Sequence, residues 1–257
     1  LFVDARAMGT RRAVARTAAC AAAVLALAGP VGAASARPSP AHQPAAALRD
    51  RGHRQRTVDG RTLRVLHLGS ATGPPILVFG AVHGDESAGI AVVRDLLADS
   101  RSIRSNVWVV PDLNPDGVAR NTRQNADGVD LNRNFPWRWQ AAGQKGDLQY
   151  SGPSVLSEPE SRFALALIAR VHPAVTIWFH QPLAVVDESG GSLSVERRFA
   201  RRVGLPLRRL QRYRGSATTW QNHRFPGTTA FVVELPPGAL GEAMIERYAH
   251  AVEAAAR

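Results

Sequence analysis

Apolar and polar residues along this chain follow two periods, one typical of buried strands and the other of amphipathic helices. Four short apolar runs predict buried strands over residues 75–82, 106–113, 175–179 and 231–233. Alternation of apolar with polar residues predicts an edge strand over residues 62–68. Helical spacing of apolar residues predicts helices over residues 86–98, 157–171, 195–203 and 241–256. Because strands and helices alternate along the chain, we predict a single α/β domain.

The stretch between two of these helices carries turn and capping signals. Asn-Pro-Asp-Gly at residues 114–117 predicts a turn. Ser157 is followed by Glu160 three residues later, with Pro159 between them, which predicts Ser157 as a helix N-cap. The segment 118–156 is polar, rich in Gly and without periodicity. A loop of that length in a compact domain tends to be functional.

The first 36 residues differ in composition from the rest of the chain. Met8 is a candidate start, and a basic stretch follows it before residues 17–33, which are small and apolar. This order predicts a signal segment over residues 1–36, cleaved near its Ala-rich end. An uncleaved membrane anchor is the alternative, although Gly29-Pro30 interrupts the apolar run. Residues 37–52 are rich in Pro and Ala and predict a linker, which leaves residues 53–257 as the folded domain.

Charge and cysteine content narrow the class of protein. The net charge is +11, but residues 1–56 hold nine Arg against two acids, so the remaining residues carry only +4. Because a phosphate-tracking surface needs clustered cations, we do not expect nucleic-acid binding. The only cysteine, Cys20, lies in the signal segment. After cleavage of that segment, the exported protein would have no stable membrane span and no thiol. Cysteine therefore cannot serve as nucleophile or zinc ligand.

Two histidines end apolar runs of the predicted sheet. His83 follows the run 75–82 and has Glu86 three residues later, and His180 directly follows the run 175–179. Open α/β sheets keep their sites at the carboxyl ends of strands. Each histidine alone would more often bond to the backbone at a strand end. Together, two His and one Glu match a catalytic zinc site with an open fourth position.

Glu234 also ends an apolar run. A lone carboxylate in such a place is usually a solvated surface group. Beside a zinc-bound water, it could instead accept a proton during attack and deliver it to a leaving amine.

The loop over residues 121–135 holds candidate substrate-binding groups. Arg133 offers a planar fork suited to a carboxylate, and Asn132 adds an amide donor. Arg123 could polarise a scissile carbonyl and stabilise its oxyanion. Arg120 and Arg138 are rival candidates for that role.

These motifs occur in the order of the zinc carboxypeptidase (carboxypeptidase A-like) family, which residues 60–257 resemble. The resemblance is carried by His83-x-x-Glu86, Asn-Pro-Asp-Gly at 114–117, Asp-Leu-Asn-Arg-Asn-Phe at 130–135, Ser-Glu-Pro-Glu at 157–160, His180 and Glu234. Within the family, the chain looks most like the small murein-peptide amidases, the γ-D-glutamyl-meso-diaminopimelate peptidases. Residues 125–136 and the pattern Gly215-Ser216-x-x-x-Trp220 are shared with them. The resemblance implies a mixed central sheet flanked by helices.

The resemblance also implies a role for each candidate residue. One Zn²⁺ would be held by His83, Glu86 and His180. Glu234 would act as general base and then as general acid, and Arg123 would stabilise the oxyanion. Asn132 and Arg133 would clamp the substrate's C-terminal carboxylate. Tyr213 would cap the bound substrate. Tyr213 could equally be an ordinary loop residue, because the segment before Trp220 differs in length.

Two departures from the amidase pattern bear on specificity. Gln181 follows His180 where the amidases tend to carry an acid, so metal affinity or substrate choice could differ. Residues 217–219 are small and polar, which argues against a bulky aromatic side chain in the pocket. This segment does not by itself identify diaminopimelate.

The leading hypothesis is an exported zinc-dependent exopeptidase that hydrolyses the amide bond before a C-terminal residue. Cell-wall peptides, cleaved at γ-D-Glu-diaminopimelate, are the expected substrates. The alternatives are a general metallocarboxypeptidase, a zinc deacylase similar to aspartoacylase or succinylglutamate desuccinylase, and a non-catalytic module that binds peptide termini. Export and the full motif at 130–135 count against the deacylase, and the occupied catalytic positions count against the binding module.

Overall fold

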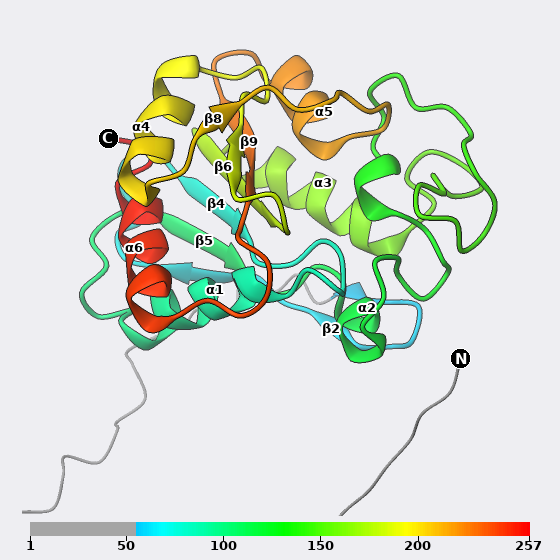
Figure 1. Cartoon of the computed structure of the whole chain (residues 1–257), viewed down its shortest axis with the longest axis horizontal. Coiled ribbons are helices and arrows are strands. Elements are labelled where there is room, and N and C mark those ends of the chain that lie inside the picture. The colour runs from blue at the N-terminus through cyan, green and yellow to red at the C-terminus, as the bar shows by residue number, and fades with distance from the viewer. Residues whose placement is uncertain (1–54) are drawn as a thin grey trace, which may run out of the picture. The chain divides into compact units, whose positions relative to one another are not determined.

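The computed structural model describes residues 55–257, which all lie in one compact unit. The predicted signal segment and linker lie outside the described residues and stay predictions. A seven-stranded mixed sheet in the order β3-β5-β4-β6-β9-β7-β8 forms the centre, with helices packed against it (Figure 1). A separate two-stranded sheet pairs β1 (Gln55–Arg56) with β2 (Thr62–Leu63). The predicted α/β fold with a mixed central sheet is confirmed.

Four parallel strands make up the middle of the large sheet. They are β5 (Val107–Val110), β4 (Ile76–Phe79), β6 (Val175–His180) and β9 (Thr229–Glu234). The edges add β3 (Leu66–Leu68), antiparallel to β5, and β7 (Val185–Asp187), antiparallel to β9, with β8 (Leu207–Arg208) parallel to β7. Every side chain of β4 and β6 is buried, as expected for parallel strands covered on both faces.

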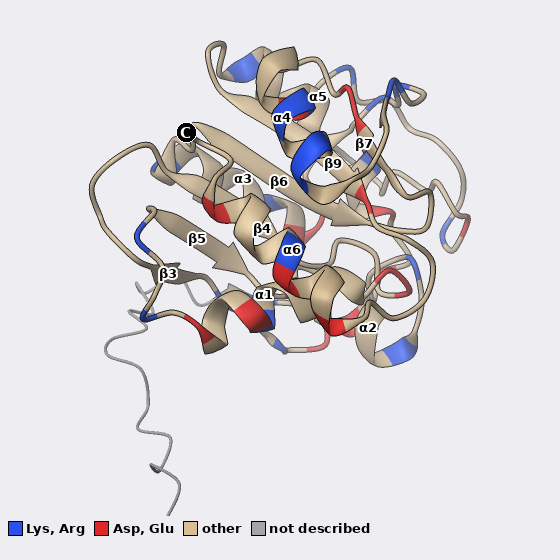
Figure 2. Cartoon of the chain, turned by 60° about the vertical axis from the view of Figure 1, so that its left-hand side comes forward, with Lys and Arg blue, Asp and Glu red and all other residues tan. Residues whose placement is uncertain are grey.

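Helices cover both faces of the sheet, and each face has its own apolar cluster. One cluster joins the sheet to α1 (Ala88–Ala98), α4 (Leu193–Val203) and α6 (Glu242–Glu253). The other joins it to α3 (Pro159–Val171) and α5 (Ala217–Arg224). The middle strands contain no Asp, Glu, Lys or Arg except at the end of β9, and basic residues lie on the outer turns of α4 (Figure 2). Within residues 55–257, no helix combines the length and apolarity needed to cross a membrane.

Three local predictions were wrong in detail. The predicted turn at 114–117 starts a short helix, α2 (Pro115–Arg120), because the Asn114 side chain accepts a hydrogen bond from Gly117 N at 2.9 Å and caps it. The N-cap of α3 is Glu158 and not Ser157. The Ser157 hydroxyl instead donates to the Glu158 carboxylate at 2.6 Å and accepts from Asn134 at 3.0 Å. The predicted edge strand is also divided between β2 and β3.

The segment between α2 and α3 contains only one 3-10 turn, η1 (Leu131–Arg133), yet buried asparagines hold its course. The Asn134 amide donates to the carbonyls of Ser151 at 2.8 Å and Ser154 at 3.0 Å. Asn125 accepts from Val129 N at 3.0 Å. This long loop therefore has a defined path, as a loop that carries functional side chains requires.

Glu160 makes folding stability depend on pH. Its side chain is fully buried in the first turn of α3, and burial raises its pKa from 4.5 to about 7. Because the folded-state pKa lies above the unfolded value, its favourable contribution is present below pH 4.5 and is lost as the pH rises through about 7. The Glu160→Gln variant should therefore gain stability relative to the parent between pH 5 and 8. The difference in free energy of unfolding should change by up to about 3 kcal/mol, and the melting temperature of the variant should rise relative to that of the parent. Thermal unfolding across that range measures this, with Glu246→Gln on α6 as the exposed control, and a difference independent of pH would contradict it.

Candidate active site

The topology brings distant residues together at the carboxyl edge of the sheet. His83 and Glu86 lie in the turn that joins β4 to α1. His180 is the last residue of β6 and pairs in register with Glu234, the last residue of β9. Because β4, β6 and β9 are parallel neighbours, the ends of all three strands meet at one place. The predicted placement of His180 and Glu234 at strand ends agrees with the observed topology, whereas β4 ends at Phe79 and His83 lies in the turn after it.

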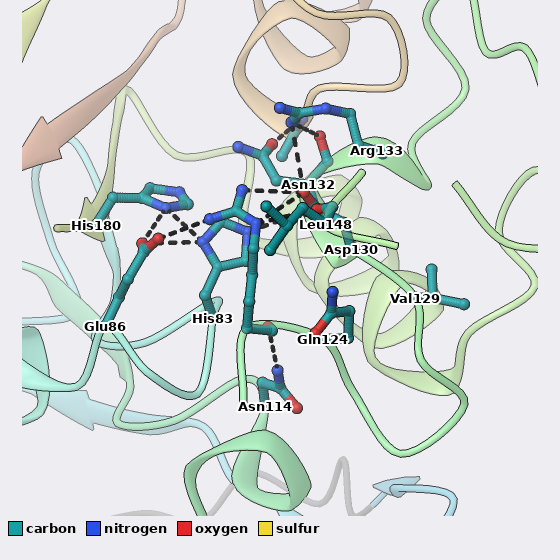
Figure 3. Close-up of polar contacts among 12 residues, drawn as sticks. His83, Glu86, Asn114, Gln124, Val129, Asp130, Asn132, Arg133, Leu148 and His180 are labelled. Atoms are coloured by element: carbon teal, nitrogen blue, oxygen red, sulfur yellow. Dashed lines mark hydrogen bonds and ion pairs between the residues drawn. The ribbon is translucent and has the colours of Figure 1, made fainter. Parts of the chain in front are cut away.

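His83, Glu86 and His180 form a buried group with the chemistry of a metal site. Each offers one ligand atom, and these atoms lie within 4.8 Å of one another. The two histidine Nδ1 atoms are 3.1 Å apart, and Glu86 Oε2 lies 2.9 Å from each of them. Figure 3 shows the three side chains pointing toward one another. Two imidazole nitrogens and a carboxylate oxygen that face a common point fit one zinc ion with three protein ligands.

The turn that carries His83 is shaped by a close backbone approach. A Cβ atom at Gly84 would lie 1.9 Å from the carbonyl carbon of Gly117 at the start of α2. Only glycine therefore lets this turn lie against α2. Burial opposes ionisation of Glu86, but the adjacent histidines outweigh it and hold the pKa of this carboxyl far below its usual range. An ionised Glu86 is the form that binds a cation.

Asp130 links the metal group to the long loop. One carboxylate oxygen lies 3.0 Å from His83 Nε2 and accepts from Asn132 N at 2.9 Å, and the other accepts from Arg123 at 2.9 Å. Asp130 is fully buried, and although burial opposes its charge, His83 and Arg123 hold its pKa below the usual range. The sequence analysis assigned it no role. Its position two residues before Asn132, as cap of η1, was the available signal.

We expect Asp130→Asn to bind zinc about 10- to 100-fold more weakly, because a group that orients a ligating histidine and raises its basicity tunes metal affinity. Chelator competition measures the dissociation constant. Asp127→Asn is the matched control in the same loop, because the Asp127 side chain is 47% exposed. Equal zinc affinity in the two variants would contradict this role.

Arg123 lies beside the metal group. Its guanidinium donates to Glu86 Oε1 at 2.7 Å and to Asp130 Oδ2 at 2.9 Å. Burial opposes its charge, but these two carboxylates raise its pKa overall. The rival candidates lie elsewhere: Arg120 pairs with Asp59 at 2.6 Å, and Arg138 lies over the ring of Trp137. The geometry therefore favours Arg123 for contact with a bound carbonyl.

All predicted site residues line one cavity of about 600 Å³. They are His83, Glu86, Arg123, Asn132, Arg133, His180, Tyr213 and Glu234. Asn132 is held in place because its side chain accepts from Ala217 N at 3.0 Å. The cavity is thus bounded by the ends of the strands on one side and by the long loop and the start of α5 on the other.

Arg133 is a buried cation with unused hydrogen-bonding capacity. Its Nη1 donates to the carbonyl of Asn132 at 2.9 Å, while its buried Nε has no partner among residues 55–257. Burial lowers its pKa, although Asp130 opposes the shift at a distance of 4.0 Å. The centre of the Tyr213 ring lies 3.9 Å from its guanidinium carbon, and Tyr213 lines the same cavity. A Cβ at Gly215 would lie 2.0 Å from the Arg133 carbonyl oxygen, which explains glycine there.

Glu234 and Gln181 complete the surroundings of the metal group. Burial raises the pKa of Glu234, and its Oε2 atom is buried without a partner in the described part of the chain. The Gln181 side chain accepts from Ala88 N at 3.0 Å and donates to Pro236 O at 2.8 Å. The backbone N–H of Gln181 donates to Glu86 Oε2 at 3.2 Å. Gln181 therefore contacts the metal group through its backbone, while its side chain fixes the neighbouring segments.

A mixed α/β sheet with a His-Glu-His group, an adjacent acid and a cavity lined by arginines has the features expected of a metal-dependent hydrolase. The zinc carboxypeptidase family model matches residues 52–192, and the chain belongs to this family. The predicted family resemblance is thereby confirmed, and the His-Glu-His group fits the one Zn²⁺ predicted as cofactor.

Relatives and solved structures agree with this membership. Murein peptide amidase A of Escherichia coli K12 is 35% identical over 123 residues, which cover 44% of this chain and 51% of that protein. Its Vibrio campbellii counterpart is 32% identical over 63% of this chain and 69% of its own length. The structure of murein-tripeptide amidase from Escherichia coli O157 has a TM-score of 0.63 at 31% identity, covering 77% of this chain and 88% of that one. The match thus spans about half the length of the K12 relative.

Carboxypeptidase A from Helicoverpa armigera has the same fold. Its structure has a TM-score of 0.63 at 20% identity and covers 78% of this chain and 68% of that one.

Proposed function

We propose that this chain is an exported exopeptidase that removes the C-terminal residue of murein peptides by hydrolysing the γ-D-Glu-diaminopimelate bond. The observation that carries the proposal is that one cavity is lined by the metal group, Glu234 and Arg133. The buried Nε of Arg133 has no hydrogen-bond partner among the described residues. A bound terminal carboxylate at Arg133 would put the last amide bond of a peptide next to the metal group. The relatives named as murein peptide amidases support the choice of substrate.

Zinc held by His83, Glu86 and His180 would lower the pKa of a water molecule and polarise the scissile carbonyl. Glu234 would accept a proton during attack and return it to the leaving amine. Its raised pKa suits this exchange, because a base is most effective when its pKa approaches the working pH. Arg123 would donate to the carbonyl oxygen as negative charge develops there.

Asn132 and Arg133 would hold the terminal carboxylate and so align the amide bond for attack. Holding reacting groups in register can supply several kcal/mol of the barrier reduction, of order 7 or more in the most favourable systems. The requirement for a free carboxylate would restrict cleavage to the last residue of a chain. Export, proposed from the composition of residues 1–36, would bring the enzyme to its cell-wall substrate.

The test incubates the zinc-loaded protein with L-Ala-γ-D-Glu-meso-diaminopimelate and, in the same tube, an ordinary peptide with a C-terminal L-residue. Mass spectrometry identifies the products. Release of free diaminopimelate alone is the expected result. Release of only the ordinary residue would replace the proposal with a general carboxypeptidase, and neither product, with zinc confirmed bound, would favour the deacylase or the binding module.

A further inference from the structure

A second charged pair lines the cavity and has no part in the proposed hydrolysis. Asp187, the last residue of β7, accepts from Arg212 Nη1 at 2.7 Å. The same carboxylate accepts from Leu210 N at 2.9 Å and from the Ser189 hydroxyl at 2.6 Å. Asp187 is buried, and its oxygens are occupied by these donors. It therefore acts as a fixed anchor that holds the Arg212 side chain at the cavity wall.

Arg212 retains hydrogen-bonding capacity beyond this anchor. Its Nη2 atom is buried and has no partner in the described part of the chain, while its side chain as a whole is 31% exposed. A guanidinium presents its donors as a planar fork that matches a carboxylate. An arginine held on one side by Asp187 can offer the rest of its fork to a ligand.

The cavity thus contains two guanidinium groups with unmet donors, at Arg133 and Arg212. Tyr213 joins them, because it follows Arg212 in the chain and its ring lies 3.9 Å from the Arg133 guanidinium carbon. The proposed function uses Arg133 for the substrate's α-carboxylate. One carboxylate cannot satisfy both groups unless their forks converge on it, and each is held by a different anchor, Asp187 for Arg212 and the long loop for Arg133.

We infer that Arg212 determines specificity by binding a second carboxylate, carried at the end of the side chain of the substrate's C-terminal residue. The inference rests on the proposed function and names the class of substrate. Thr218, Thr219 and Val232 line the same cavity, where their small side chains would flank the methylene groups of such a side chain. A side chain that ends in an amine alone would meet a cation and leave the Arg212 donors unmet.

Three peptides that differ only in the last residue separate the two ends of that side chain. In L-Ala-γ-D-Glu-X, X is meso-diaminopimelate, 2-aminopimelate or lysine. The first has both a distal carboxylate and a distal amine, the second has only the carboxylate, and the third has only the amine. We expect the zinc-loaded parent to hydrolyse the first two with a kcat/KM about 10- to 100-fold above that of the lysine peptide, the effect of one charge-assisted contact.

Arg212→Gln is expected to remove this preference by lowering kcat/KM for the two distal carboxylates about 10- to 100-fold, with the lysine peptide changed less than about threefold. Arg212→Lys, which keeps the charge but not the fork, should lose an intermediate amount. Arg209→Gln, an exposed arginine of the same segment outside the cavity lining, is the matched control. An equal loss for all three peptides, or a parent that prefers lysine, would overturn the inference.

Binding measured without turnover separates this inference from the proposed function. Dissociation constants for the three peptides are determined by calorimetry in the Glu234→Gln background, with and without Arg212→Gln. Weaker binding of only the two distal carboxylates in the double variant would support the role of Arg212, even if no peptide were hydrolysed. Failure of the zinc-loaded parent to hydrolyse any of them would overturn the proposed function alone. Equal dissociation constants across the series would overturn the inference alone.

Discussion

Glu234→Gln is expected to lower kcat for the murein tripeptide by about 100- to 10,000-fold, the usual contribution of a general acid–base group. The amide has nearly the shape of the carboxylate but cannot accept a proton at neutral pH. Glu234 ends β9 in register with His180, so it lies next to the metal group, and burial raises its pKa. Zinc content and the peptide dissociation constant should stay within about threefold of the parent, since Glu234 is neither a metal ligand nor a carboxylate clamp.

Single-turnover kinetics, with zinc measured in the same preparations, provides the readout for this variant. Glu242→Gln, an exposed glutamate in the first turn of α6, is the matched control and should keep the parent's kcat. A Glu234→Gln enzyme with kcat within threefold of the parent would remove this carboxylate from the chemistry. If the parent itself showed no activity and Glu234→Gln bound the peptide as tightly as the parent, the protein would instead be a binding module.

His180→Ala is expected to lower zinc affinity by more than about 100-fold, beyond the effect of a residue that only orients a ligand, and to abolish hydrolysis. His180 Nδ1 lies 2.9 Å from Glu86 Oε2 and 3.1 Å from His83 Nδ1, so its loss removes one of three converging donors. The remaining pair would leave the site with two protein ligands. Chelation of zinc from the parent should have the same effect on activity, and added zinc should restore it.

Chelator competition and elemental analysis measure the zinc affinity and stoichiometry of this variant. His250→Ala is the matched control, because His250 is an exposed residue of α6 that does not line the cavity holding the metal group. Stoichiometric zinc with unchanged affinity in His180→Ala would mean that the metal binds elsewhere.

The metal group could be predicted from sequence because its residues end apolar runs. A buried parallel strand is recognisable as a short apolar run, and the residue that follows it must lie at the carboxyl edge of the sheet. His83, His180 and Glu234 all occupy such positions, so their convergence follows from the order of the strands. The loop residues 123, 132 and 133 have no such periodic context. Their assignment depended on residue chemistry and on the resemblance to a family.

Other parts of the site depend on long-range partners that no local pattern reveals. Strands β7 and β8 have three and two residues, too few for periodicity, so the anchoring of Arg212 by Asp187 was not foreseen. The role of Asp130 follows from two simultaneous contacts, with His83 and Arg123. Ser157 fits the N-cap pattern, but Asn134 from the long loop engages its hydroxyl, and the helix begins one residue later.

The central claim is that a free C-terminal carboxylate, bound at Asn132 and Arg133, directs cleavage by the adjacent metal group. The most direct measurement compares hydrolysis of L-Ala-γ-D-Glu-meso-diaminopimelate with that of the same peptide carrying a carboxamide at the L-centre of diaminopimelate. The account predicts a kcat/KM about 100-fold or more higher for the free acid, since the amide leaves the buried Arg133 guanidinium unpaired. Equal rates for the two peptides would contradict exopeptidase action at this site.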